Sequence, residues 1–124
     1  AIDILQAAME SVAFRLAEVL GRIERVCPVR EVIASGGAIA ASPVWPQMIA
    51  DVLGRDIEVN SEPEASLRGA VLLALEKTGK IELTDGLSAI KTRTISSHPT
   101  CHAVYRKARK RNQSVYGSAG RTNK

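Results

Sequence analysis

The feature that most constrains the fold of this chain is the alternation of two short apolar segments with longer helical ones. Residues 31–35 and 56–59 are short and centred on β-branched side chains, which is typical of buried strands. Apolar residues spaced by three and four, together with capping signals, predict helices over residues 2–26, 42–53, 63–78 and 98–116. Strands that alternate with helices favour an α/β fold with parallel strand pairing.

Two strands are too few for a stable sheet of this kind. Buried parallel strands need further neighbours and helices on both faces. We therefore expect an incomplete domain, whose missing strands come from the upstream part of a parent protein or from a partner. The chain starts without Met and almost inside a helical pattern. This favours a cut piece of a longer protein, and a processed or edited terminus stays open.

Capping residues mark the ends of the predicted helices. Ser42 suits the N-cap of the second helix, with Pro43 in its first turn, and Gly54 suits its C-cap. Ser61 and Glu64 have the spacing of a capping box before the third helix. The predicted organisation is a domain segment over residues 1–80, a loop over 81–97, a C-terminal helix over 98–117 and a disordered tail over 118–124.

Charge is distributed unevenly along the chain. Residues 1–90 carry 8 Lys/Arg and 13 Asp/Glu, whereas residues 91–124 carry 9 Lys/Arg and no acidic residue. The basic run 106–111 can bind nucleic acid or anionic lipid, or it can be the solvated face of a terminal helix. Only Tyr105 and Tyr116 flank it, and a nucleic-acid surface needs more aromatic residues, so we favour the solvated face. No apolar run reaches the roughly 18 residues of a membrane span.

The cysteines and histidines give little sign of a metal site. Cys27 and Cys101 lie in different segments without a CxxC pair, which favours two free thiols in a reducing cytoplasm. His98 and His102 are four residues apart with Cys101 between them, so the two rings can face one ion. No third well-placed ligand accompanies them. We therefore expect a helix-start histidine and a surface histidine, and no bound metal.

The most informative stretch is residues 34–54, where a predicted strand ends in Gly36-Gly37 and a helix follows. Two glycines let a ligand approach the backbone without meeting a Cβ atom. Nucleotides often bind at such strand ends in open α/β sheets. A Gly-Gly turn by itself is also compatible with a tight connection that binds nothing, so the evidence must come from the residues around it.

The order of motifs in this stretch resembles the adenosine motif of the FGGY carbohydrate kinases. The matching pieces are Ser35-Gly36-Gly37-Ala38, Ser42-Pro43-Val44-Trp45 and residues 47–54, Gln-Met-Ile-Ala-Asp-Val-Leu-Gly. Residues 8–14 resemble the Glu-Gly-Val-Ala-Phe helix of that family, and residues 64–70 resemble its Glu-Ala-x-x-x-Gly-Ala helix. The resemblance covers about residues 1–80. The spacing between Gly37 and Ser42 is one residue longer than in many members.

This resemblance implies a partial ribonuclease-H-like, actin-like ATPase domain of α/β class, taken from the C-terminal part of such a kinase. By position, Gly36, Gly37 and Ala38 bring backbone to the ribose and phosphates of ATP. Ala41 and Ser42 are placed near the adenine, within the one-residue ambiguity of the spacing.

Two other side chains in the motif invite a functional assignment. Trp45 has a helical position that favours packing over stacking on a base. Asp51 is expected to cap a helix or pair locally, and we do not assign it as a catalytic base.

The family transfers the γ-phosphoryl group of ATP, with Mg²⁺, to a sugar hydroxyl, and an Asp acts as the base. In the family that Asp and the phosphate loops precede the segment present here, so no catalytic residue is assigned and the isolated chain is expected to be inactive. Asp85-Gly86 has the letters of a phosphate loop but follows the adenosine motif.

The resemblance implies a substrate and partners as well. A sugar or sugar acid would bind through the missing N-terminal domain, with gluconate as the first choice and xylulose as the second. The apolar helix faces are expected to contact the rest of the parent protein or a second copy. Two other classes stay open, a non-catalytic interaction module with a kinase-like fold and a basic nucleic-acid-binding protein.

Overall fold

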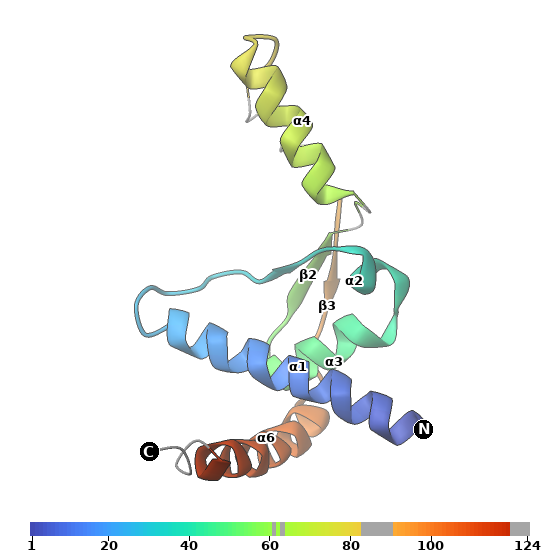
Figure 1. Cartoon of the computed structure of the whole chain (residues 1–124), viewed down its shortest axis with the longest axis vertical. Coiled ribbons are helices and arrows are strands. Elements are labelled where there is room, and N and C mark those ends of the chain that lie inside the picture. Colours follow the sequence, from blue (N-terminus) through green and yellow to red (C-terminus); the bar gives the residue numbers. More distant parts are fainter. Residues whose placement is uncertain (61, 63, 83–90, 120–124) are drawn as a thin grey trace.

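The computed structural model describes residues 1–60, 62, 64–82 and 91–119. The described elements are helices α1 (Ile2–Ile23), α2 (Gly37–Ala41), α3 (Val44–Leu53), α4 (Ala65–Lys77) and α6 (Pro99–Ala119), and strands β1 (Ile33–Ala34), β2 (Ile57–Asn60) and β3 (Thr92–Ile95). The strands form one sheet in the order β1-β2-β3. Helices α1, α3 and α6 gather at one end of this sheet, and α4 extends away from the other end (Figure 1).

The sheet is mixed. Strand β1 runs parallel to β2, with Ile33 opposite Glu58, which confirms the parallel pairing predicted for the first two strands. The connection between them contains α2 and α3, as a parallel crossover requires. Strand β3 pairs antiparallel with the other edge of β2, with Ile95 opposite Ile57.

Strand β3 corrects one expectation, because residues 92–95 lie within the stretch predicted as a loop. Three of its four residues, Thr92, Arg93 and Thr94, are exposed, so the alternation of apolar and polar residues that identifies a strand is missing. The strand forms because the free edge of β2 offers backbone groups to pair with. The threonines suit a strand through their β-branched side chains.

Helix α3 is the centre of the core. It is buried on several sides because it contacts α1, α6 and the sheet. The remaining core comes from small and aromatic residues of α1 and from the inner face of β2. The buried apolar residues are Ala13, Phe14, Ala17, Ile39, Met48, Ile49, Ala50, Val52, Ile57 and Val59.

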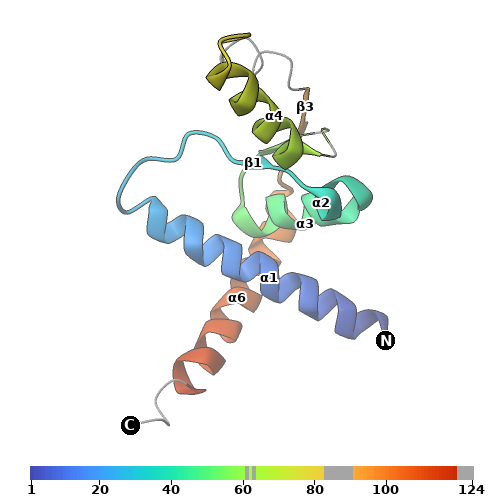
Figure 2. The ribbon, with the colours of Figure 1, turned by 45° about the horizontal axis from the view of Figure 1, so that its top comes forward.

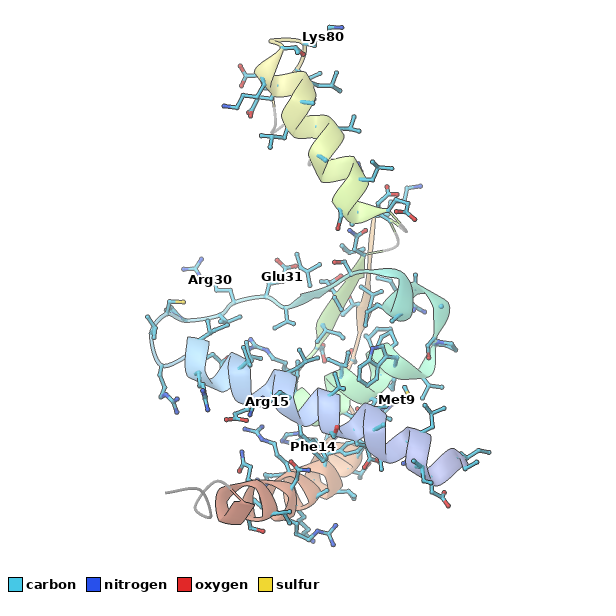
Figure 3. All side chains as sticks on the ribbon, in the orientation of Figure 1. Met9, Phe14, Arg15, Arg30, Glu31 and Lys80 are labelled. Atoms are coloured by element: carbon cyan, nitrogen blue, oxygen red, sulfur yellow. The ribbon has the colours of Figure 1, made fainter. Side chains whose placement is uncertain are left out.

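Phe14 joins α1 to α6, which cross each other (Figure 2). Figure 3 shows Phe14 on the side of α1 that faces α6. Its ring meets the ring of Tyr105 edge to face, with centroids 6.3 Å apart and planes at 68°. Such pairs contribute stability beyond the area that they bury.

The Tyr105 hydroxyl makes stability depend on pH at the alkaline end. Burial, and then the carboxylates of Glu10 and Asp51, raise the pKa of Tyr105 above its ordinary value of 10.0. The folded state therefore holds this proton where the unfolded state has lost it, so stability falls as the pH rises above about 10. We expect Tyr105→Phe to remove this component while keeping the ring contact. Urea unfolding of both proteins from about pH 8 to 11 checks it, and parallel pH profiles would contradict it.

Helix α4 protrudes from the body, with Lys80 just beyond its far end (Figure 3). None of its residues is buried, and Leu67, Val71 and Leu73 are 60%, 49% and 50% exposed. Its small residues, Ala65, Gly69, Ala70 and Ala74, allow close packing against a neighbour. Within the described part of the chain that neighbour is absent.

The helix ends follow the capping residues in most places. The Trp45 N–H donates to Ser42 Oγ at 3.2 Å, and Gly54 ends α3 with φ 69° in the left-handed region, as predicted. The predicted capping box includes residue 61, which lies outside the described residues. Helix α2 was not anticipated. Helix α6 runs to Ala119, two residues beyond the predicted helix end. The first two residues of the expected disordered tail are therefore helical.

Candidate functional site

The end of β1 opens onto free space. Gly36 adopts φ 110° and ψ 164°, a conformation that side chains disfavour, and turns the chain from β1 into α2. A Cβ atom added at Gly36 or Gly37 would meet nothing within 4 Å. The N–H groups of Ile39 and Ala40 donate to the Gly36 carbonyl at 3.1 and 3.0 Å, which closes the first turn of α2. A ligand can therefore approach this turn closely.

An apolar hollow of about 480 Å³ lies beside this turn. Its lining residues come from α1 and from the start of the adenosine-like motif: Ala8, Met9, Val12, Ala38, Ser42 and Trp45. This volume falls within the range of small-molecule sites, which combine apolar walls with a few polar groups. The geometry suits the flat, weakly polar face of a nucleobase.

The five residues predicted to bind ATP do not all lie at the hollow. Ala38 and Ser42 line the hollow, whereas Gly36 and Gly37 form the turn next to it in the chain. Ala41 is exposed and is not among the lining residues. Sequence reasoning missed the contribution of α1, because the family-like motif over residues 8–14 does not indicate that its helix faces residue 38.

Trp45 serves packing, as predicted. It is partly buried and packs against the core cluster, and it also forms one wall of the hollow. This position gives the hollow a rigid aromatic wall.

Asp51 is the centre of a polar cluster between α3 and the start of α6. Its side chain is 7% exposed. Asp51 Oδ1 accepts the backbone N–H of His98 at 2.6 Å and the Gln47 amide at 3.1 Å. Asp51 was expected to cap a helix or to pair locally, and it does pair locally with Gln47 while also binding the N–H of the residue that precedes α6. Its partner could not be read from the sequence, because the bond with His98 spans 47 residues.

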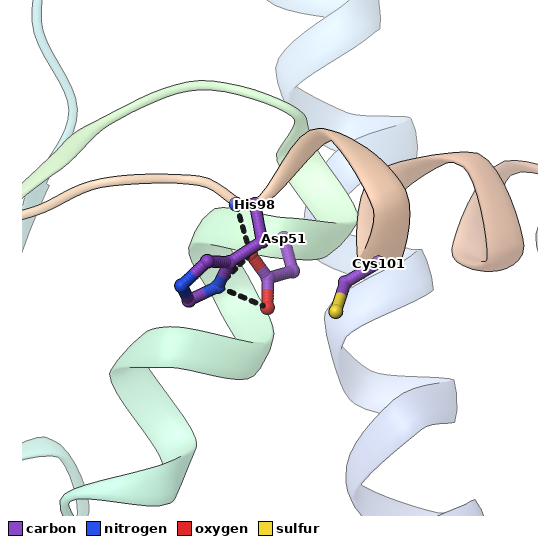
Figure 4. Close-up of side chains that lie close together, drawn as sticks. All are labelled: Asp51, His98 and Cys101. Carbon is purple, nitrogen blue, oxygen red and sulfur yellow. Dashed lines mark hydrogen bonds and ion pairs between the residues drawn. The ribbon is translucent and has the colours of Figure 1, made fainter.

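His102 corrects another expectation. It is partly buried, its Nδ1 lies 3.0 Å from the Asp51 carbonyl oxygen, and its ring lies over Gly54. It is therefore a packing residue and not a surface histidine. The sequence spacing would let His98 and His102 face one ion, although no metal was expected there, and the structure instead turns the His102 ring toward the Asp51 carbonyl and Gly54. The ligand-type side chains that lie together are Asp51, His98 and Cys101 (Figure 4).

The basic face of α6 is mostly solvated. Arg106, Lys107, Lys110 and Arg111 are exposed, whereas Arg109 is partly buried. Among the described helices, none is long and apolar enough to cross a membrane.

The arrangement of helices and mixed sheet recurs as one part of a larger protein of known structure. The crystal structure of xylulose kinase from Rhodospirillum rubrum shares this fold with a TM-score of 0.73 at 23% identity, over 93% of this chain and 24% of that one. The chain belongs to the FGGY family of carbohydrate kinases, because the model of the family's C-terminal domain matches residues 1–76.

Curated relatives with different names are similar to this chain. A probable L-xylulose kinase from Haemophilus influenzae is 33% identical over 70% of this chain and 18% of its own length. The gluconokinase of Bacillus subtilis is 36% identical over 68% of this chain and 17% of its own length. The chain thus spans about a fifth of the curated relatives that it matches.

Proposed function

We propose that this chain supplies the adenosine-binding face of an ATP-dependent carbohydrate kinase. The observation that carries the proposal is the open turn at Gly36-Gly37 beside an apolar hollow, inside the region that matches the family's C-terminal domain. The backbone of Gly36, Gly37 and Ala38 would face the ribose and phosphates, where the absence of large side chains permits close approach. Adenine would lie in the hollow near Ser42.

Mg²⁺ is expected in the complete enzyme, where it would neutralise charge on the transferring phosphoryl group. Residues 35–42 contain no carboxylate, so the turn itself offers no acidic ligand for the ion. The metal would therefore reach this face with the phosphates of ATP. Its protein ligands would come from the rest of the parent protein.

The sugar stays a proposal, with gluconate as the first choice and xylulose as the second. The similar relatives include both a gluconokinase and probable L-xylulose kinases, at nearly equal identity. The residues that would bind the sugar are expected outside this chain. Location in the cytoplasm also stays a prediction.

Uncovered apolar faces support the proposal that the rest of the parent protein packs here. On α1, Leu16, Val19 and Ile23 are between 44% and 47% exposed, and α4 exposes three further large apolar residues. Burial of such side chains is favourable, and soluble monomers rarely leave large apolar patches uncovered. The isolated chain is accordingly expected to be inactive.

A valine at position 37 tests the adenosine assignment in the protein made from the complete gene. Gly37→Val has room in the fold, because a Cβ there meets nothing within 4 Å, but its side chain would occupy space that the nucleotide needs. We expect kcat/KM for ATP to fall about 10- to 100-fold, with the KM for the sugar unchanged. Coupled kinase assays with gluconate and with xylulose measure both parameters.

Gly69→Ala is the control, because Gly69 is a helical glycine far along the chain on α4, and a single methyl group there changes little of the face that the rest of the parent protein is expected to cover. It should leave the KM for ATP unchanged. Equal activity of the Gly37 variant and the wild type would contradict the nucleotide assignment. If the complete protein transferred phosphate to no sugar, the non-catalytic interaction module would replace the kinase.

A further inference from the structure

The cluster of Asp51, His98 and Cys101 contains three different metal-binding groups. One ligand atom from each side chain lies within 4.8 Å of the other two. Figure 4 shows the imidazole and the thiol on either side of the carboxylate. Asp51 is held rigidly in α3, while His98 and Cys101 are exposed at the start of α6. The exposed side chains can move the short distance that binding of a common ion requires.

The His98 ring lies close to the side chains of Gln47 and Asp51. Its Nδ1 lies 3.0 Å from Gln47 Nε2 and 3.4 Å from Asp51 Oδ2. The Gln47 amide is oriented by its bonds to Asp51 Oδ1 and to the Ser96 carbonyl, at 3.1 and 2.9 Å. These two bonds use both hydrogens of the Gln47 amide, so Nδ1 faces the carboxylate, which lies 3.3 Å away at Oδ1 and 3.4 Å away at Oδ2.

A metal ion can bind between His98 Nδ1 and Asp51 Oδ2, because both atoms can direct a lone pair at its positive charge. Oδ2 is free for such a role. Oδ1 takes the bonds from the His98 backbone and from Gln47, and within the described residues Oδ2 has only the long contact to the ring.

The chemistry of the three ligands selects the ion. Imidazole and thiolate disfavour Mg²⁺ and Ca²⁺, which prefer oxygen ligands. Zn²⁺ accepts nitrogen, sulfur and carboxylate oxygen together, and sites with three protein ligands keep a fourth position for water. The exposure of His98 and Cys101 provides an entry path.

We propose that Asp51, His98 and Cys101 bind Zn²⁺ through Oδ2, Nδ1 and Sγ, with water as the fourth ligand. Binding displaces the thiol proton of Cys101 to solvent, since the thiolate is the ligand. The ion ties α3 to the start of α6, so it stabilises the junction between them. This site is separate from the nucleotide turn and does not depend on the proposed kinase activity.

The experiment uses this chain in a Cys27→Ser background. Cys27 is an exposed free thiol outside the cluster, and its removal leaves one thiol in the protein. Co²⁺ is the probe, because its visible absorption reports tetrahedral geometry and its near-ultraviolet charge-transfer band reports a thiolate ligand. Competition with a chromophoric chelator then gives the affinity for Zn²⁺.

We expect the Cys27→Ser protein to bind one Zn²⁺ per chain and to show the thiolate band with Co²⁺. Adding Cys101→Ser should abolish the band. Adding either Cys101→Ser or His98→Ala should weaken zinc binding by more than about tenfold, since even outer partners of metal ligands contribute 10- to 100-fold. His98→Ala keeps the backbone N–H that caps α6 through Asp51.

Heat unfolding with and without zinc gives a second measurement. Zinc should raise Tm of the Cys27→Ser protein by more than it raises Tm of the Cys101 double variant, because the double variant binds the ion more weakly in the folded state. Absence of the thiolate band in the Cys27→Ser protein, or an undiminished band after Cys101→Ser, would overturn the proposal.

Discussion

Replacing Gly54 with alanine is expected to lower the free energy of unfolding by about 2–3 kcal/mol. Two effects combine. Gly54 has φ 69°, where a side chain is strained, and its added Cβ would lie 2.3–2.7 Å from three atoms of the His102 ring. The ring must then rotate away and lose its contact with the Asp51 carbonyl. Urea unfolding of the two proteins measures the loss.

Gly79→Ala separates the two effects. Gly79 has the same φ of 69°, but a Cβ there meets nothing within 4 Å. It should therefore show only the backbone strain, about 1 kcal/mol. Because α4 protrudes, hydrogen exchange of α4 should accompany the global measurement.

His102→Ala gives a second control for the clash. In that background, Gly54→Ala should cost no more than Gly79→Ala, since the ring is gone. Equal losses for Gly54→Ala and Gly79→Ala in the wild-type background would show that the ring moves aside freely, and the predicted clash would then be wrong.

Removing the Asp51 carboxylate is expected to be the other large effect. Asp51→Ala leaves the His98 N–H and the Gln47 amide without their acceptor at a site where the side chain is 7% exposed. Unsatisfied groups of this kind cost about 1–3 kcal/mol each, so we expect a loss of about 2–4 kcal/mol. Asp51→Asn keeps one acceptor oxygen and should lose less.

Asp56 supplies the matched control for Asp51. It also accepts a backbone N–H, that of Ser97 at 3.0 Å, but it is exposed. Water can replace its bond, so Asp56→Ala should cost about 1 kcal/mol or less. Urea unfolding in the presence of EDTA, with hydrogen exchange at the start of α6, compares the two. Similar losses would contradict the importance of burial at Asp51.

Local signals and family motifs were enough to predict much of this molecule. The cap at Ser42, the left-handed end at Gly54 and the parallel pairing of the strands predicted over residues 31–35 and 56–59 are confirmed. These features depend on residues close together in the chain, or on the period of apolar side chains, and both are written in the sequence. The motif over residues 34–54 likewise indicated the family that the comparison with residues 1–76 shows.

Only the tertiary structure decided the contacts between distant segments. Residues 92–95 became a strand because β2 had a free edge, although their exposed side chains carry no strand pattern. His102 became a packing residue because Gly54 left room for its ring. The sequence by itself determined the local elements and the family. The joining of Asp51 to His98 and Cys101, and of α1 to the turn after β1, depended on how the helices pack, since pairing across tens of residues leaves no periodic trace in a single sequence.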